Sequence, residues 1–130
     1  MDSRYIYIIC PVRGVDPSEK KFLDDYVRAA ESMGHRAHYP PRDIEQDLDK
    51  SGIVIMEQHR EAMGQCDEVH IYWTEKSEGS RVDFGMAFMT EKPIRLINYH
   101  SLKRTSHKSY TNVLMDLHDR YSGQTVDVNR

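Results

Sequence analysis

Residues 68–88, EVHIYWTEKSEGSRVDFGMAF, contain the pattern that decides the fold. The first part, EVHIYW (68–73), is a short apolar run of the kind that forms a buried strand. After a polar turn, SEGSRVDFGMAF (77–88) opens a helix that we expect over about 79–90. A buried strand that leads through a short turn into a helix is the repeating unit of parallel α/β sheets.

The same unit recurs along the whole chain. Other segments with the composition of strands are YIYIIC (5–10), HRAHYP (35–40) and PIRLIN (93–98), and TVDV (125–128) is a candidate fifth strand. Further helices are expected over about 19–33, 52–64 and 111–121. The alternation predicts an α/β fold, a doubly wound parallel sheet of four to five strands with helices on both faces. For the helix over 19–33, Ser18 is the candidate N-cap and Gly34 the expected end.

Composition and charge bound the class of protein. The 130 residues correspond to one domain, 1–130. The net charge is −3, so we expect no binding of a nucleic acid polymer through a basic face. The N-terminus lacks a signal-peptide pattern, and no apolar stretch approaches the roughly 20 residues of a membrane helix, so we expect a cytoplasmic protein that does not bind membranes. Cys10 and Cys66 lie in or beside apolar runs and are expected to be buried thiols.

The loop before the helix at 79–90 is the first candidate binding site. In open parallel sheets, ligands bind beyond the carboxyl ends of the strands, which directs attention to the loops 11–17, 74–80 and 98–108. Ser77, Gly79 and Ser80 precede a helix whose first N–H groups have no partner within the helix, and such a terminus attracts phosphate or carboxylate. The alternative is an ordinary serine N-cap followed by a turn glycine.

Asp83 lies one turn inside that helix. The helix N-terminus favours its charged form, so Asp83 is a candidate nucleophile or stabiliser of a cationic transition state. The alternative is a solvent-facing acid that only complements the helix dipole.

Three residues on other segments complete the set of candidates. Arg13 follows the first strand and can clamp a phosphate, or it is a surface arginine. Tyr7 lies in that strand and either belongs to the core or stacks on a base. His59, on the helix over 52–64, is a candidate proton-transfer group or a plain surface histidine. The sequence contains no metal-binding spacing, no GxGxxG and no P-loop, so we predict neither a metal nor a cofactor.

Taken together, these segments resemble the nucleoside 2-deoxyribosyltransferase family, and most closely its 2′-deoxynucleoside 5′-phosphate N-hydrolase branch. The resemblance covers most of the chain, from IYIICPVRG to KPIRLI. It is carried by a YxxxxxRG segment from Tyr7 to Gly14, an EQ-containing helix that ends in QCDEV, the SxG of residues 77–79, the carboxylate of Asp83 followed by xGxA, and KPI at 92–94.

The resemblance implies a flavodoxin-like sheet, a homodimer whose partner completes each site, and cleavage of the N-glycosidic bond of a small-molecule nucleoside or nucleotide. Asp83 matches the nucleophile position and Tyr7 a position that contacts base or sugar. In the phosphohydrolase branch, Ser and Arg side chains and a helix terminus hold the 5′-phosphate. By this matching Arg13 falls near the phosphate and Ser77 and Gly79 in the phosphate loop, to which we add Ser80.

Three departures from the family pattern keep alternatives open. The family nucleophile is usually Glu, whereas here it is Asp83; an acidic residue on the second helix is replaced by His59. Arg81 stands where the family favours small or apolar residues, and its charge can recruit a phosphate or pair with Asp83. We therefore expect an N-glycosidase that hydrolyses a nucleoside 5′-monophosphate. The alternatives are a deoxyribosyltransferase, a nucleotide-binding module without catalysis, and an unrelated flavodoxin-like protein such as a flavin domain.

Overall fold

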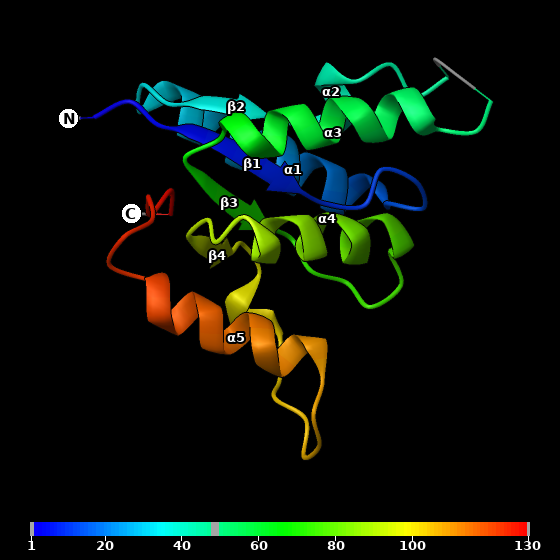
Figure 1. Ribbon diagram of the computed structural model, residues 1–130. Coiled ribbons are helices and arrows are strands. Elements are labelled where there is room, and N and C mark those ends of the chain that lie inside the picture. Colours follow the sequence, from blue (N-terminus) through cyan, green and yellow to red (C-terminus); the bar gives the residue numbers. More distant parts are fainter. Residues whose placement is uncertain (1, 48–49, 130) are drawn as a thin grey trace.

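A four-stranded parallel sheet forms the centre of the molecule (Figure 1). The computed structural model describes residues 2–47 and 50–129. The strands are β1 (Tyr5–Ile9), β2 (Arg36–His38), β3 (Glu68–Ile71) and β4 (Ile94–Leu96). They lie side by side in the order β2-β1-β3-β4, and every pair is parallel. The chain leaves β1 in one direction to β2 and later in the other to β3, so the topological switch point lies between β1 and β3.

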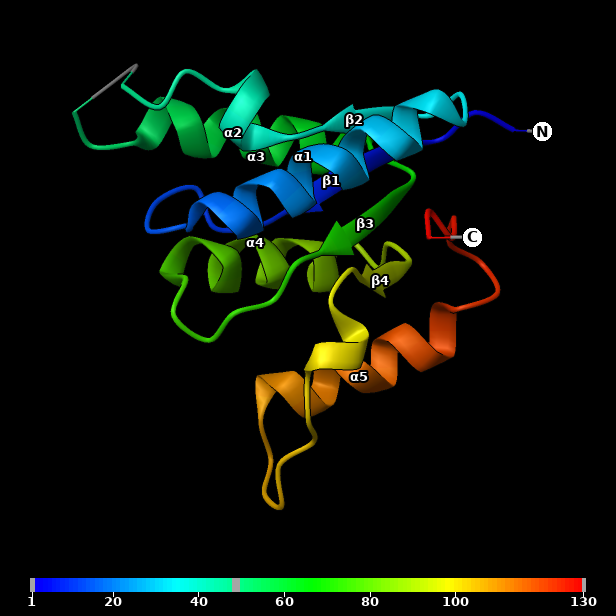
Figure 2. The same ribbon diagram turned by 180° about the vertical axis from the view of Figure 1, so that it is seen from behind.

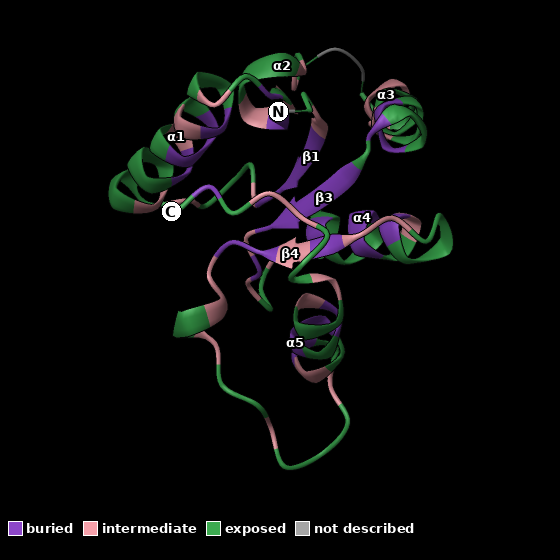
Figure 3. Cartoon of the chain, turned by 90° about the vertical axis from the view of Figure 1, so that its left-hand side faces the viewer, coloured by how far each residue is buried: buried purple, intermediate pink, exposed green. Residues whose placement is uncertain are grey.

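Helices cover both faces of this sheet, as the sequence predicts (Figures 2 and 3). The helices are α1 (Pro17–Ser32), the short α2 (Pro40–Asp43), α3 (Ile53–Gln65), α4 (Glu78–Met89) and α5 (Tyr110–Tyr121), with a 3-10 turn η1 (Tyr99–Ser101) after β4. One face packs against α1, and the other packs against α3, α4 and α5. Among the described residues, no helix combines the length and the apolar character that crossing a membrane requires.

Alternation along β1 builds the two cores. Ile6 and Ile8 point towards α1, whereas Tyr7 and Ile9 point towards the α3–α4 face, and all four side chains are fully buried. Figure 3 shows the two central strands, β1 and β3, almost entirely buried. The expected burial of the two thiols is confirmed, because Cys10 and Cys66 are 7% and 2% exposed.

Two local predictions are wrong. Helix α1 begins two residues earlier than expected, with Asp16 rather than Ser18 as its N-cap. The Asp16 carboxylate accepts from the Glu19 N–H at 2.8 Å, and the Glu19 side chain accepts from the Asp16 N–H. Pro17 occupies the first turn, where a backbone N–H would have no partner within the helix, so its missing N–H costs nothing. Gly34 follows the helix with a φ of 95°, in agreement with the expected end.

Residues 125–128 are not a fifth strand. Side chains rather than a strand ladder hold this segment, since the Val126 N–H donates to Oε2 of Glu68 at 2.8 Å and Arg95 donates to Oγ1 of Thr125 at 3.0 Å. The sheet therefore has four strands within the described part of the chain.

A buried polar chain lies under that segment. Glu68 and His70 on β3 are both 0% exposed, and His70 Nε2 lies 2.5 Å from Oε2 of Glu68. The other imidazole nitrogen, Nδ1, lies 2.7 Å from the hydroxyl of Tyr26, and Arg4 donates to Oε1 of Glu68 at 2.8 Å. Burial lowers the pKa of His70, so the neutral ring accepts from Tyr26 and donates to Glu68. Because side chains alternate along β3, Glu68 and His70 both point to the face of the sheet that packs against α1.

Candidate active site

A cavity of about 550 Å³ opens at the carboxyl ends of the strands, next to the switch point between β1 and β3. Its walls come from the loop after β1, the start of α3 and the first turn of α4, which all lie at one end of the sheet in Figure 1. Six of the seven residues predicted from the sequence line it: Arg13, His59, Ser77, Gly79, Ser80 and Asp83. Segments that are far apart in the sequence therefore converge on one cavity.

Asp83 does not face solvent, so the alternative of a solvent-facing acid that only complements the helix dipole is excluded. It is 7% exposed and lies on the side of α4 that faces the cavity. The hydroxyl of Tyr7 donates to Oδ2 of Asp83 at 3.3 Å, and Nδ1 of His59 lies 3.4 Å from Oδ1. The second contact falls within ion-pair distance but lacks the alignment of a hydrogen bond, because neither ring nitrogen of His59 has a hydrogen-bond partner. The carboxylate is thus flanked by a phenol and an imidazole.

Tyr7, the seventh predicted residue, lies behind the cavity wall and is 0% exposed. Burial, and then the negative charge and hydrogen bond of Asp83, raise the pKa of the Tyr7 hydroxyl far above its usual range. The hydroxyl therefore stays protonated and acts as a donor to Asp83. The ring belongs to the core, as the first interpretation of the sequence has it, and its hydroxyl contacts the carboxylate of the site.

The loop before α4 is an ordinary N-cap that also lines the cavity. Oγ of Ser77 accepts from the Ser80 N–H at 3.2 Å and from the Ser80 hydroxyl at 2.8 Å. Ser80 is only 2% exposed, so its buried hydroxyl holds the Ser77 side chain in place through this hydrogen bond. Arg13 and Lys76 bring two positive side chains to the same cavity as this helix start. A helix N-terminus with two cations is suited to bind an anion.

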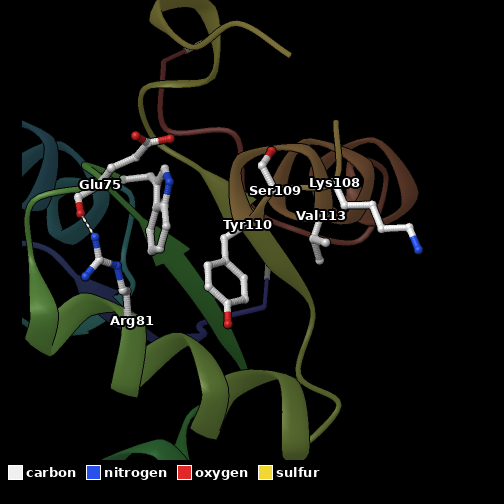
Figure 4. A pocket seen from close by; sticks show the side chains of 7 residues that line it. Glu75, Arg81, Lys108, Ser109, Tyr110 and Val113 are labelled. Carbon is white, nitrogen blue, oxygen red and sulfur yellow. Dashed lines mark hydrogen bonds between the residues drawn. The ribbon is translucent and has the colours of Figure 1, made fainter. Parts of the chain in front are cut away.

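Arg81 does not reach Asp83. Its guanidinium donates to the backbone carbonyl of Glu75, beside a separate pocket of about 470 Å³ between α4 and α5 (Figure 4). Residues two apart on a helix point in different directions, so Arg81 and Asp83 face different pockets. Among the described residues, the ion-pair contact of the Asp83 carboxylate is with His59 and not with an arginine that would lower its nucleophilicity.

Sequence reasoning missed three residues of the site. Lys76 lies within the predicted loop 74–80 and Cys10 directly follows β1, but the sequence does not show that their side chains face the cavity. His38, on β2, packs its ring 4.9 Å from that of Tyr7 and 6.2 Å from that of His59. No sequence pattern joins these segments, because only the pairing of β1 with β2 brings His38 beside Tyr7. Among the described residues, no group of His, Cys, Asp and Glu has an arrangement that could hold a metal ion.

Two solved structures have a similar fold. One is a 2-deoxyribosyltransferase from Bacillus psychrosaccharolyticus, with a TM-score of 0.61 and 14% identity over 84% of this chain and 89% of the other. The second is a CMP N-glycosidase from Clostridium botulinum, with a TM-score of 0.54 and 18% identity over 72% of this chain and 67% of the other. No family model matches the sequence, and a comparison with curated proteins finds no match. At these identities the likeness shows a shared α/β fold.

Proposed function

We propose that this protein is an N-glycosidase that hydrolyses the base–sugar bond of a nucleoside 5′-monophosphate. The observation that carries the proposal is the buried carboxylate of Asp83, held between Tyr7 and His59 in the same cavity as the N-terminus of α4. Such a cavity offers a nucleophile at one place and an anion site at another, which is what a phosphorylated sugar with a scissile anomeric bond requires.

Asp83 carries the first chemical step. One carboxylate oxygen attacks the anomeric carbon while the bond to the base breaks, and a glycosyl ester forms on Asp83. The departing base takes up a proton, which His59 supplies from its position 3.4 Å from Asp83. Water then attacks the anomeric carbon, the ester bond breaks, and the now neutral His59 accepts the proton that the water releases. The products are the sugar phosphate and the free base.

The other residues orient the reactants. The Tyr7 hydroxyl donates, from behind the cavity wall, to the oxygen of Asp83 that does not attack. Arg13, Lys76 and Ser77, with the first N–H groups of α4, hold the 5′-phosphate. Gly79 has no side chain that would keep the phosphate away from the backbone at the helix start. The Ser80 hydroxyl donates to the Ser77 hydroxyl and so fixes its position.

The structural neighbours support this chemistry. One is a CMP N-glycosidase and the other a 2-deoxyribosyltransferase, so both act on the bond between a base and a sugar. The second neighbour also supports the alternative of a deoxyribosyltransferase, in which another base instead of water accepts the sugar from Asp83. Because phosphorylated nucleosides are intracellular compounds, we place the reaction in the cytoplasm.

The proposal includes a homodimer formed through the α4–α5 face. Phe88, Met89, Tyr110 and Val113 on these two helices are between 41% and 83% exposed. Phe88, Tyr110 and Val113 also line an apolar groove of about 330 Å³. A second copy of the chain would cover this surface, and the pocket shown in Figure 4 would then lie at the interface between the two copies.

A chromatographic assay for free base tests the function. Purified protein is incubated with ribo- and deoxyribonucleoside 5′-monophosphates and with the matching nucleosides, beside Asp83→Ala. Base release from a monophosphate that disappears in Asp83→Ala supports the hydrolase. Release that requires a second base identifies a transferase. If no base is released and nucleotides still raise the melting temperature, the protein is a binding module and the hydrolase proposal is wrong.

A further inference from the structure

An exposed stripe runs along one side of α4. Its members recur at the spacing of a single helix face and are Arg81, Val82, Gly85, Phe88 and Met89. The three large apolar side chains among them, Val82, Phe88 and Met89, are 45%, 57% and 83% exposed. Apolar side chains that gather on one exposed face mark a contact with another molecule.

Gly85 lies at the centre of this stripe, and packing within the chain does not explain it. It is the eighth residue of α4, whereas the other glycines of the described helices, Gly64 and Gly79, lie next to helix ends. A glycine inside a helix is less stable than an alanine. A Cβ atom at Gly85 would meet no described atom within 4 Å apart from the neighbouring helix backbone. What the missing side chain does allow is the close approach of a second backbone from outside.

The stripe is symmetric about Gly85. Val82 and Phe88 lie three residues before and after it, and Arg81 and Met89 lie four residues before and after it. If two copies of α4 cross antiparallel at Gly85, a residue before Gly85 lies near the residue equally far after it in the partner. Val82 of each copy then packs against the partner's Phe88, so the stripe is complementary to itself.

The charges at the two ends of α4 favour the antiparallel direction. Arg81 lies near the start of α4, and its guanidinium donates to the carbonyl of Glu75, which leaves further N–H groups for a partner (Figure 4). Glu91 lies just beyond the other end of α4 and is exposed. An antiparallel crossing brings Arg81 of one copy towards the partner's Glu91 and opposes the two helix dipoles favourably. A parallel crossing would bring equal charges together.

We propose that the homodimer forms by an antiparallel crossing of the two α4 helices at Gly85, with Arg81 of each copy paired to Glu91 of the partner subunit. This inference rests on the homodimer proposed above and not on the chemistry assigned to the cavity. Asp83 faces the cavity from the other side of α4, so the crossing does not cover the carboxylate. Val82 belongs both to the stripe and to the cavity wall, so the partner's Phe88 supports the rim of the cavity.

The size of residue 85 separates a close helix crossing from a general apolar contact. Sedimentation equilibrium of the whole protein gives the dissociation constant Kd of the dimer for wild type, Gly85→Leu and Gly64→Leu. Leucine adds apolar surface and would strengthen a general apolar contact, but at a close crossing it forces the two backbones apart. We expect Gly85→Leu to raise Kd about tenfold or more. Gly64→Leu is the matched control on an exposed position of α3 and should leave Kd unchanged. A Kd that falls or stays the same in Gly85→Leu overturns the proposal.

Charge reversal tests the antiparallel arrangement. Arg81→Glu and Glu91→Arg should each raise Kd about threefold or more, and the double variant should recover most of the loss. The melting temperature shows that each variant is folded. If the double variant dissociates as readily as the single variants, the arrangement is wrong. A monomeric wild type would remove the homodimer together with this inference, whereas the assay for free base tests the hydrolase separately.

Discussion

The hydroxyl of Tyr7 on β1 lies 3.3 Å from Oδ2 of Asp83 on α4, and both side chains are buried. The two residues are 76 positions apart in the sequence, and the contact joins the centre of the sheet to the helix that follows β3. Because the raised pKa of Tyr7 keeps its hydroxyl protonated, the contact has a fixed donor and a fixed acceptor. It leaves Oδ1 on the side of His59 as the oxygen available for chemistry.

Tyr7→Phe should therefore reduce kcat for base release by about 3- to 10-fold, the equivalent of one hydrogen bond, with a smaller effect on KM. The ring remains in the core, so the melting temperature should change little. Steady-state kinetics and a thermal melt of the same preparation check both expectations. An unchanged kcat would show that the hydroxyl does not assist Asp83.

Ser77→Ala should affect both stability and phosphate binding. Loss of the N-cap should destabilise the protein by about 1 kcal/mol, and loss of a phosphate ligand should raise KM for a monophosphate about tenfold or more. KM for the matching nucleoside should not change, because it has no phosphate. Ser109→Ala is the matched control, since Ser109 caps α5 in the same way and accepts from the Asn112 N–H at 3.1 Å. It should lose similar stability but keep the KM for the monophosphate; an equal rise of KM in both variants would remove Ser77 from the phosphate site.

Glu68→Gln should destabilise the protein strongly at neutral pH. The change removes the charge that pairs with Arg4 and places an amide next to donors from His70 and Val126, so we expect a loss of roughly 3 kcal/mol in the free energy of unfolding. Urea denaturation measures it, with the exposed Glu61→Gln as the control that should stay near wild type.

The stability lost in Glu68→Gln should also depend on pH. Burial alone would raise the pKa of Glu68, but the hydrogen bond from His70, the Arg4 guanidinium and the Val126 N–H lower it from 4.5 to about 2. A carboxylate with a lowered pKa in the folded state stabilises the fold above pH 4.5, and this contribution is lost as the pH falls from about 4.5 towards 2. The stability difference between wild type and Glu68→Gln should therefore narrow in this range. A constant difference would mean that Glu68 is not ionised in the folded protein.

Phe88→Glu should convert the proposed homodimer into a monomer. Phe88 is 57% exposed and lines the apolar groove between α4 and α5, so a charge there would be buried without a partner in a dimer. Phe22→Glu is the control, because Phe22 is 43% exposed on α1, on the other face of the sheet. Sedimentation velocity should give a dimer for wild type and Phe22→Glu and a monomer for Phe88→Glu. A wild-type monomer would exclude the dimer.

Much of the site could be predicted because its residues are close in sequence. Ser77, Gly79, Ser80 and Asp83 belong to one turn and the first turns of one helix, so local spacing already placed them together. Arg13 was predicted from its place after β1, since the carboxyl ends of parallel strands meet at one edge of the sheet. The opposite directions of Arg81 and Asp83 also follow from helical periodicity, and a stricter use of it would have separated them at the start.

Other features depended on contacts that no local pattern contains. The capping box of α1 was missed because Ser18 and Asp16 are both good N-caps, and the choice rests on the partner that Glu19 provides. The expected fifth strand has suitable composition, but Glu68 and Arg95 bind its backbone and side chains in place of a neighbouring strand. His38 was missed because it belongs to an edge strand with no motif of its own.

By itself, the sequence determined the order of strands and helices, the parallel sheet and the segment that carries the carboxylate, because apolar periodicity, turn residues and helix ends act over a few neighbouring positions. Only the tertiary structure decided which side chains face one another. The pairing of β1 with β2 brought His38 to Tyr7, and the packing of α3 and α4 on the same face of the sheet brought His59 and Tyr7 to Asp83. Burial and charge at these contacts, which depend on residues up to 76 positions apart, determine the protonation of the site.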